Sequence, residues 1–507
     1  MTLQLGSDIV KDKNKNLFEE YINTLDDFNK QKVNDFLCDI QLHCNLSNNE
    51  NRLILNDFKN GILYYNSIGI SLDKSLELLN PEYLGGFYAR GASVWFSLDD
   101  SAKIYPVSIK HGTMSIFRVS AYLKQQVVPQ LLQLALTFTI KRFPSLATTL
   151  KKGFFWHYLD STKRHFNIEK ETNIPCQPLK VSVSGSQAFR VLYYENRISI
   201  EFFHVLTDGT GGMEFLKALV AEYIRLTGVV IDNQNLIMDI NQTPSASETR
   251  NEFPNVEKSK STSGIINKLA IQMDGDLAAS NPCRMLHFKM DATKLYQTAK
   301  KFNSTVTAYL LSLMFIAHKA ATDKLHGETA IMVPVNMRKF YPSKTLRNFS
   351  LYCSIRVSLE NIEDTQSIID DVKEQLTTKG SKEAMTEMNT AAHKLVSSIK
   401  LIPLFIKQPI ARIMYGILGD NAFTNTLSNL GVVKLPKEYE QHIDYFDFSL
   451  GTAVINRASC GLITYNNTAV FSITKRTFDP TFEEKLLKLL QNDGIEVIVE
   501  GSEIYER

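Results

Sequence analysis

The sequence has few cysteines, and their arrangement excludes two common classes of protein. Six cysteines are scattered over 507 residues, with no Cys-x-x-Cys pair and no finger-like spacing to a histidine. A disulfide-stapled scaffold is therefore excluded. Cys38, His43 and Cys44 lie close together in the sequence, but three candidate ligands in an ordinary stretch do not define a zinc site. We expect no bound metal, and cysteines that remain reduced.

The sequence also lacks a long apolar run and a secretory leader. Its longest apolar block, Val306 to Ala321, is interrupted by polar residues that include Ser312 and Lys319. A membrane-spanning helix needs about 18 or more consecutive apolar residues. The first residues, MTLQLGSDIVKDKNKN, carry aspartate and lysine where a signal peptide needs an apolar core. These absences predict a cytoplasmic protein with no transmembrane segment.

An excess of charge of one sign is absent too. Lysine and arginine number 56 and aspartate and glutamate 54, so the net charge is only +2. Such a balance gives no global attraction to nucleic acid. Hydrophobic residues make up 44% and charged residues 22%, which excludes collagen, coiled coil and wholesale disorder. We expect a folded protein with no nucleic-acid partner.

Composition divides the chain into four parts. Residues 1–85 are polar and rich in Asn, Asp and Lys, which predicts an N-terminal extension of short helices. Residues 231–264 are rich in Ser, Thr, Asn and Glu without periodicity, which predicts a linker or long surface loop. Residues 86–230 and 265–507 each mix strand and helix patterns. This mixed order favours an α+β fold over a doubly wound parallel sheet.

Several elements can be placed by their periodicity. Apolar residues at helical spacing predict helices over Gly212–Leu226 and Thr307–Ala321. Alternating runs predict a meander of three strands over Gly451–Asn456, Gly461–Tyr465 and Thr468–Thr474.

The most informative segment is ISIEFFHVLTDGTGGMEFLKAL, residues 198–219. An alternating strand ends in His204, and Asp208 and Gly209 lie in the turn before an amphipathic helix. Histidine suits general-base catalysis because its pKa lies near operating pH. The glycines of the turn, Gly209, Gly211 and Gly212, would permit unusual backbone angles. A core histidine beside an ordinary Asp-Gly turn is the alternative interpretation of the same spacing.

The segment His204 to Gly209 resembles the His-x-x-x-Asp-Gly signature of the chloramphenicol acetyltransferase-like superfamily. That superfamily includes BAHD acyltransferases, condensation domains of nonribosomal peptide synthetases, and bacterial alcohol acetyltransferase-like enzymes. Four further stretches resemble its motifs in the same order and extend the resemblance over roughly residues 110–475. They are Ser120–Pro144, Asn303–Leu311, Val333–Arg338 with Asn348 and Phe349, and Thr426–Gly431.

The sequence departs from two branches of the superfamily. Condensation domains usually carry two adjacent histidines, whereas Phe203 precedes His204 here. The Asp-Phe-Gly-Trp-Gly motif of plant BAHD enzymes is also absent, and Ser428 to Gly431 occupies that region. These departures favour a stand-alone O- or N-acyltransferase similar to the bacterial alcohol acetyltransferase-like branch.

The resemblance implies two α/β lobes around a central tunnel, with His204 near its middle. His204 would take a proton from a hydroxyl or amine acceptor, which would then attack an acyl thioester directly, without an acyl-enzyme. Ser428 is the expected donor to the oxyanion, with Asn429 and Thr426 as alternatives. Metal is not required by this chemistry.

Asp208 and Gly209 complete the catalytic motif in this interpretation. The resemblance implies that Asp208 is structural and pairs with an arginine, and Arg338 matches the family's position. A solvated charge at a strand end is the alternative for Arg338, and an ordinary loop serine is the alternative for Ser428.

Acyl-CoA is the co-substrate that the resemblance implies, with no permanently bound cofactor. The sequence has no Gly-x-Gly-x-x-Gly or phosphate loop, so no other nucleotide is expected. Two other functions remain open. One is a catalytically silent binding protein of the same fold. The other is a condensation or transfer step in lipid or peptide biosynthesis that uses a separate acyl carrier protein.

Two apolar segments fall outside the motifs. Trp156, His157 and Tyr158 predict core or edge-strand packing more than a tunnel wall. Residues 401–418, LIPLFIKQPIARIMYGIL, predict a tunnel wall or a helix between lobes. The alternative for this second segment is contact with a membrane surface or a lipid chain.

Overall fold

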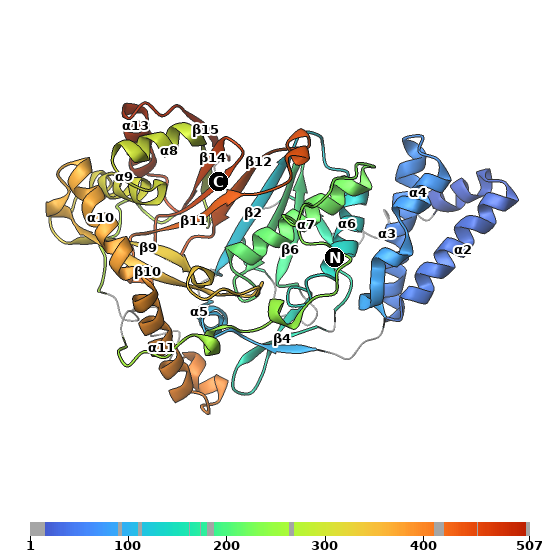
Figure 1. The fold of residues 1–507 in the computed structure, drawn as a ribbon, viewed down its shortest axis with the longest axis horizontal. Helices are drawn as coiled ribbons and strands as arrows, with labels where there is room; N and C mark the ends of the chain where they lie inside the picture. The colour runs from blue at the N-terminus through green and yellow to red at the C-terminus, as the bar shows by residue number, and fades with distance from the viewer. Residues whose placement is uncertain are drawn as a thin grey trace.

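A computed structural model describes most of the chain. It covers residues 16–89, 94–109, 114–161, 163–172, 174–179, 187–262, 268–409, 420–453 and 455–502. Three sheets and their helices form two main bodies and a helical extension, arranged along the long axis of the molecule (Figure 1).

The first body is built on a five-stranded sheet in the order β12-β2-β7-β6-β5. Its strands are β2 (Ile116–Leu123), β5 (Ile168–Lys170), β6 (Phe189–Tyr194), β7 (Arg197–Phe203) and β12 (Ile443–Leu450). Helices α6 (Pro129–Ile140) and α7 (Gly209–Leu226) cover one face, because every second residue of β2 and β7 is apolar and buried beneath them. Phe117, Phe202 and Phe215 belong to this core.

The second body is built on a seven-stranded sheet in the order β10-β9-β11-β13-β14-β8-β15. The strands are β8 (Arg284–Asp291), β9 (Glu328–Asn336), β10 (Ser350–Ser358), β11 (Asn425–Val433), β13 (Ala458–Tyr465), β14 (Thr468–Lys475) and β15 (Val497–Gly501). Its helices are α8 (Ala292–Lys301), α9 (Val306–Ala320), α10 (Thr365–Lys379), α11 (Lys382–Ser398) and α13 (Thr481–Asn492). Helix α9 is apolar nearly all round because it is buried between α10 and α13.

Strand β12 crosses from the second half of the chain into the first body. It pairs antiparallel with β2, for example Asp447 with Ser120. The strand expected over residues 451–456 is not found at residues 451–453, 455 and 456, and residue 454 lies outside the described ranges. The strand that precedes β13 is instead β12, at Ile443–Leu450. Alternation identifies a strand but not its partner, so the sequence alone did not reveal this exchange.

The segment between the two halves runs largely over the surface, but a few contacts anchor it to both bodies. Glu248, in a short 3₁₀ turn (Ala246–Glu248), accepts hydrogen bonds from the buried guanidinium of Arg142, one of them 2.8 Å long. Further along, Phe253 and Val256 are buried in the core of the second body. The segment lacks periodicity because it has no regular elements beyond short 3₁₀ turns such as Phe253–Asn255.

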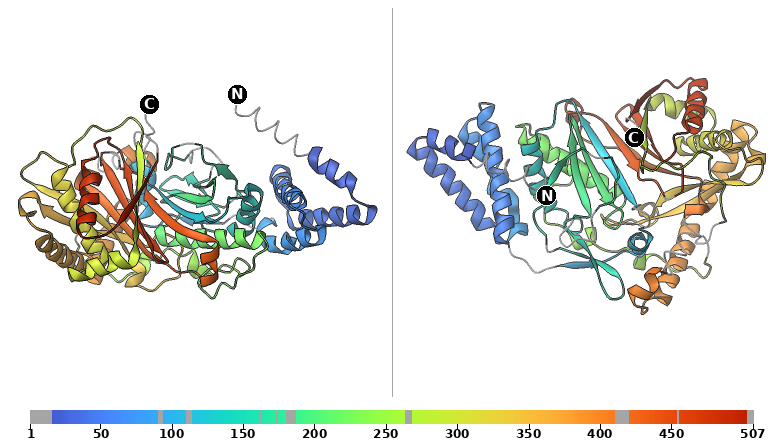
Figure 2. Two further views of the ribbon diagram at one scale, coloured as in Figure 1. Left: turned by 90° about the horizontal axis from the view of Figure 1, so that it is seen from above. Right: turned by 180° about the vertical axis from the view of Figure 1, so that it is seen from behind.

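The N-terminal residues form helices that are longer than expected. They are α2 (Asp27–His43), α3 (Asn48–Ser67) and α4 (Leu72–Leu78), followed by a 3₁₀ segment (Pro81–Tyr88). Helix α3 packs on α6 through Phe58 and Ile62, which belong to the core of the first body. The phenol of Tyr65 donates a 2.6 Å hydrogen bond to the carbonyl oxygen of Leu226, at the end of α7. Figure 2 shows these helices at one end of the molecule.

A small antiparallel sheet, in the order β1-β4-β3, completes the fold. Its strands are β1 (Trp95–Ser97), β3 (Thr149–Lys152) and β4 (His157–Asp160). Because β4 is the central strand, the aromatic residues Trp156 to Tyr158 lie on and beside an interior strand rather than an edge strand.

The two-lobed α+β arrangement predicted from the sequence is confirmed by the sheets and their two separate cores. Among the residues that the structure describes, no helix has the length and apolar character needed to cross a membrane.

Candidate active site

His204 lies directly after β7, where the chain leaves the sheet of the first body. Its backbone N–H donates a 2.9 Å hydrogen bond to the carbonyl oxygen of Ser115. The imidazole ring stacks on Tyr105 of α5 (Tyr105–Ser108), with centroids 4.8 Å apart, and meets Phe117 edge-on at 5.1 Å. Two aromatic rings therefore hold the half-buried imidazole in one orientation.

The protonation of the ring nitrogens follows from the contacts of Asn348. The Nδ2 of Asn348 donates a 2.7 Å hydrogen bond to the carbonyl oxygen of His204, which fixes the orientation of the amide. Asn348 Oδ1 then faces His204 Nδ1 at 2.8 Å. An amide oxygen only accepts, so Nδ1 must carry the hydrogen. In the neutral ring, Nε2 is then left with its lone pair.

Burial also favours the neutral ring. Removal from water lowers the pKa of His204 below its usual 6.5, and the nearby charge of Asp208 offsets this only in part. At neutral pH the imidazole is therefore uncharged and its Nε2 is able to accept a proton.

Asp208 is the N-cap of helix α7 and uses both of its oxygens. Oδ1 accepts a 3.1 Å hydrogen bond from the backbone N–H of Gly211. Oδ2 accepts from the backbone N–H of Phe349 at 2.8 Å and from Arg338 Nη1 at 2.7 Å. The side chain is buried, so these charge-assisted bonds are shielded from solvent.

Arg338 is the partner that the sequence analysis expected for Asp208, and it also holds a loop. Its Nε and Nη2 donate to the carbonyl oxygen of Thr345, and Nη2 donates to that of Arg347 at 2.7 Å. The residue lies in a 3₁₀ turn (Met337–Lys339) after β9. It thus ties the aspartate of one body to the loop of the other body that carries Asn348.

The glycines of the motif are needed for space rather than for unusual backbone angles. Gly209, Gly211 and Gly212 all lie in α7, and none of them has a positive φ. This corrects the expectation from the sequence. A Cβ at Gly211 would lie 2.2 Å from the carbonyl oxygen of Leu346, and one at Gly212 would meet the ring of Phe117 at 2.8 Å. The start of the helix is pressed against both bodies.

Strand β11 reaches the start of α7 through Leu430, two residues beyond Ser428. Leu430 packs on Gly209 so closely that a Cβ there would lie 2.4 Å from its side chain. Leu427 points into the core of the second body, so Ser428 and Thr426 point to the opposite face of the strand. Asn429 is already engaged, since Nδ2 donates to Thr307 Oγ1 and Oδ1 accepts from the backbone N–H of Gly431. Among the three candidates, Asn429 is therefore the least suited to an oxyanion.

Two residues of the site were missed by sequence reasoning. Asn348 belongs to one of the motifs of the resemblance but was not assigned a role, and Tyr105 lies in a segment without a recognisable pattern. Both touch His204 from far along the chain, Asn348 from 144 positions away. A pairing over that distance leaves no local pattern in a single sequence.

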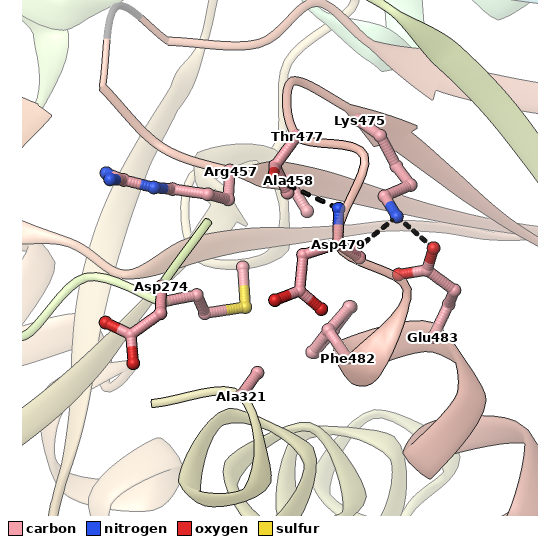
Figure 3. Close-up of a pocket in the computed structure, with 10 residues that line it drawn as sticks. Asp274, Ala321, Arg457, Ala458, Lys475, Thr477, Asp479, Phe482 and Glu483 are labelled. Carbon is pink, nitrogen blue, oxygen red and sulfur yellow. Dashed lines mark hydrogen bonds and ion pairs between the residues drawn. The ribbon is translucent and has the colours of Figure 1, made fainter. Parts of the chain in front are cut away.

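Two pockets lie near the junctions of elements, and they differ in character. The pocket in Figure 3 lies between β14 and α13 and is lined by Lys475, Asp479 and Glu483, among others. Lys475 is buried and pairs with Glu483 and with the carbonyl oxygen of Asp479, so its charge is used internally. We therefore assign this pocket a structural role.

The second pocket is lined by residues from both halves of the chain, including Met114, Cys176, Asn281 and Gly451. Met114 directly precedes Ser115, whose carbonyl oxygen accepts the N–H of His204. This pocket therefore lies next to the strand end that carries the histidine. In the part of the chain that the structure describes, no group of three or more His, Cys, Asp or Glu side chains could hold a metal ion.

Solved structures with the same architecture were found, although no family model and no curated protein matches the sequence. TRI101 of Fusarium sporotrichioides, complexed with coenzyme A and T-2, is 9% identical with a TM-score of 0.53, over 80% of this chain and 99% of that one. TRI3 trichothecene 15-O-acetyltransferase of the same organism is 11% identical with a TM-score of 0.51, over 79% and 95%. The first condensation domain of the calcium-dependent antibiotic synthetase is 10% identical with a TM-score of 0.51, over 80% and 100%.

This chain is therefore a two-lobed α+β protein whose structural neighbours include acetyltransferases and a condensation domain. The fold is the one shared by these acetyltransferases and this condensation domain, which agrees with the fold that the resemblance implied. At about 10% identity the likeness shows a shared fold, and the chemistry depends on the residues of this chain.

Proposed function

We propose that this protein is an acyltransferase that moves an acyl group from an acyl thioester, acyl-CoA in the first place, to a hydroxyl or amine acceptor. The observation that carries the proposal is the state of His204. The ring is neutral, its Nδ1 is bonded to Asn348, and its Nε2 keeps a lone pair. Coenzyme A in the TRI101 complex and the 15-O-acetyltransferase activity named for TRI3 support the choice of donor and acceptor.

The reaction proceeds in one direct displacement. His204 Nε2 takes the proton from the acceptor, whose oxygen or nitrogen attacks the thioester carbonyl carbon. The tetrahedral intermediate then collapses, the carbon–sulfur bond breaks, and the imidazolium returns the proton to the leaving thiolate. No acyl-enzyme forms, so no serine or cysteine nucleophile is required.

Three contributions lower the barrier. Holding donor and acceptor together supplies about 7–11 kcal/mol, and general-base help adds about 10²–10⁴-fold. Ser428 is assigned as the hydrogen-bond donor to the oxyanion, because its side chain points away from the core of the second body. The strand that carries it, β11, contacts the histidine loop where Leu430 packs on Gly209. Thr426, on the same face of the strand, is the second choice.

Asp208, Gly209 and Arg338 act as positioning residues in this proposal. The Asp208–Arg338 pair holds the loop of Asn348 against the histidine turn, and Gly209 leaves room for Leu430. Residues 86–230 and 265–507 then work as the two lobes of one catalytic unit that shares β12 between them. We place the reaction in the cytoplasm.

The test uses purified protein, a panel of alcohols and amines, and acyl-CoA donors of several chain lengths, with release of free thiol as the readout. We expect turnover with wild type and a loss of about 10²–10⁴-fold in His204→Ala. His326→Ala is the matched control, because His326 is 81% exposed. Undiminished turnover in His204→Ala would overturn the assignment of the base.

The same panel distinguishes the other functions. Turnover with acyl groups on a carrier protein, but not on coenzyme A, would indicate a carrier-dependent transfer or condensation step. Binding of coenzyme A without turnover by any acceptor would indicate a silent binding protein.

A further inference from the structure

A cluster of large apolar side chains lies exposed where the β3–β4 hairpin meets the segment after α11. Phe154 is 68% exposed, Phe405 64% and Leu401 77%. We call this cluster the apolar patch and define it as Phe154, Phe155, Leu401, Phe405 and Ile406. The part of the apolar segment that the structure describes, residues 401–409, thus exposes three of its large side chains instead of burying them between lobes. Residues 410–418 lie outside the described ranges.

The two halves of the patch are held together by specific contacts. The backbone N–H of Leu404 donates a 2.8 Å hydrogen bond to the carbonyl oxygen of Phe154. The ammonium group of Lys407 lies 3.4 Å from the ring centroid of Trp156, in the turn of the same hairpin. Leu404 itself is buried beneath the exposed residues. The patch is therefore a built surface and not a chance meeting of two loops.

Lysines border the patch. Residues 149–159, which end directly before Asp160, and residues 388–409, which begin directly after Glu387, contain five lysines and no aspartate or glutamate. Lys152, Lys394 and Lys400 are exposed, and Lys152 and Lys400 lie within two residues of Phe154 and Leu401. The whole chain has a net charge of only +2, so this local excess of lysine is a feature of the surface and not of the composition.

We propose that the apolar patch docks the protein on an anionic lipid surface. Phenylalanine and leucine side chains insert at the boundary between headgroups and acyl chains, while the lysines meet the acidic headgroups. Figures 1 and 2 show the hairpin and the segment after α11 side by side at the edge of the molecule. A lipid bilayer can deform around a protruding apolar surface, whereas a protein partner would need a groove of complementary shape.

The chain carries its own reporter for this contact. Its two tryptophans, Trp95 and Trp156, both lie at this small sheet. Trp95 is 68% exposed and packs edge-on against Tyr158 of β4, with centroids 6.4 Å apart. Insertion of the neighbouring residues into lipid would move the tryptophans to a less polar environment, so their emission would shift to shorter wavelength.

The test titrates the full chain with vesicles of phosphatidylcholine alone or with phosphatidylserine added, followed by tryptophan emission and co-sedimentation. We expect binding to the anionic vesicles that is at least tenfold weaker on neutral vesicles or in about 0.5 M salt. The Phe154→Ser/Phe405→Ser and Lys152→Glu/Lys400→Glu double variants should each weaken binding at least tenfold. Leu325→Ser/Val230→Ser, which removes equally exposed apolar residues elsewhere, should bind as wild type does.

Three results would overturn the proposal. One is no binding to anionic vesicles by the folded wild type. The second is equal binding by wild type and both patch variants. The third is a wild-type dimer, or a complex with an acidic acyl carrier protein, that the Phe154→Ser/Phe405→Ser variant abolishes while vesicle binding is absent or unchanged. None of these outcomes depends on the chemistry at His204, because vesicle binding is measured without turnover.

Discussion

Asn348 is the residue whose replacement tests the histidine geometry most sharply. It makes two hydrogen bonds to His204, one to the ring at 2.8 Å and one to the carbonyl oxygen at 2.7 Å. The side chain is buried, so water does not readily replace it. Asn348→Ala leaves Nδ1–H and a carbonyl oxygen without partners, at a cost of about 1–3 kcal/mol for each group.

The ring then loses the bond that selects its tautomer. If the preference for a free Nε2 weakens by about 1–3 kcal/mol, kcat should fall about 5- to 150-fold, since 1.36 kcal/mol corresponds to tenfold. The KM for the donor should change little, because Asn348 bonds to the histidine rather than being assigned to substrate. The assay is steady-state thiol release at pH 7.5.

Asn348→Asp separates orientation from simple loss of a side chain. A carboxylate beside Nδ1 would raise the pKa of His204, so the activity of this variant should need a higher pH than wild type. Asn389→Ala is the control, because Asn389 is also buried and bonds to the backbone of Phe253. A kcat for Asn348→Ala within twofold of wild type, with His204→Ala inactive, would show that Asn348 does not set the tautomer of His204.

Three other replacements have expected outcomes. Arg338→Met should lower the free energy of unfolding in urea by about 3–5 kcal/mol, because Asp208 is left buried without its partner; an unchanged midpoint and slope would contradict this. Gly211→Ala should cost about 1–3 kcal/mol in the same measurement, since its Cβ would meet the carbonyl oxygen of Leu346. Burial lowers the pKa of His318 to about 3. As the pH falls from about 6.5 toward 3, the unfolded chain protonates this histidine and the folded chain does not, so the folded state loses stability. Between pH 7 and pH 4.5, urea unfolding should show wild type losing about 2–3 kcal/mol more stability than His318→Leu, and equal losses in the two proteins would contradict this.

The sequence pointed to the first residues of the candidate site because their spacing is local. His204, Asp208 and Gly209 lie within six residues of one another, where a strand pattern gives way to a helix pattern. The pairing of Asp208 with Arg338 required the resemblance, because the two residues are 130 positions apart. The role of Asn348 was not predictable from either source, since it depends on which way one amide faces.

In the fold, too, features with a local sequence pattern were predicted and features that depend on distant contacts were not. Helices α7 and α9 were predicted within a few residues of their bounds, because each has a long apolar pattern. The transfer of β12 to the other sheet was missed, because a strand's own alternation says nothing about its neighbour. The glycines of α7 were assigned to turn geometry, whereas tertiary contacts with Leu346 and Phe117 account for them.

The role of His204 as the base can be measured from the pH dependence of kcat/KM for acyl transfer. We expect the activity of wild type to rise with pH through one ionisation below 6.5 and to be constant above it, because burial lowers the pKa of His204. The residual activity of His204→Gln should not show this ionisation. A wild-type profile without it, or the same profile in His204→Gln, would contradict the assignment of His204 as the base.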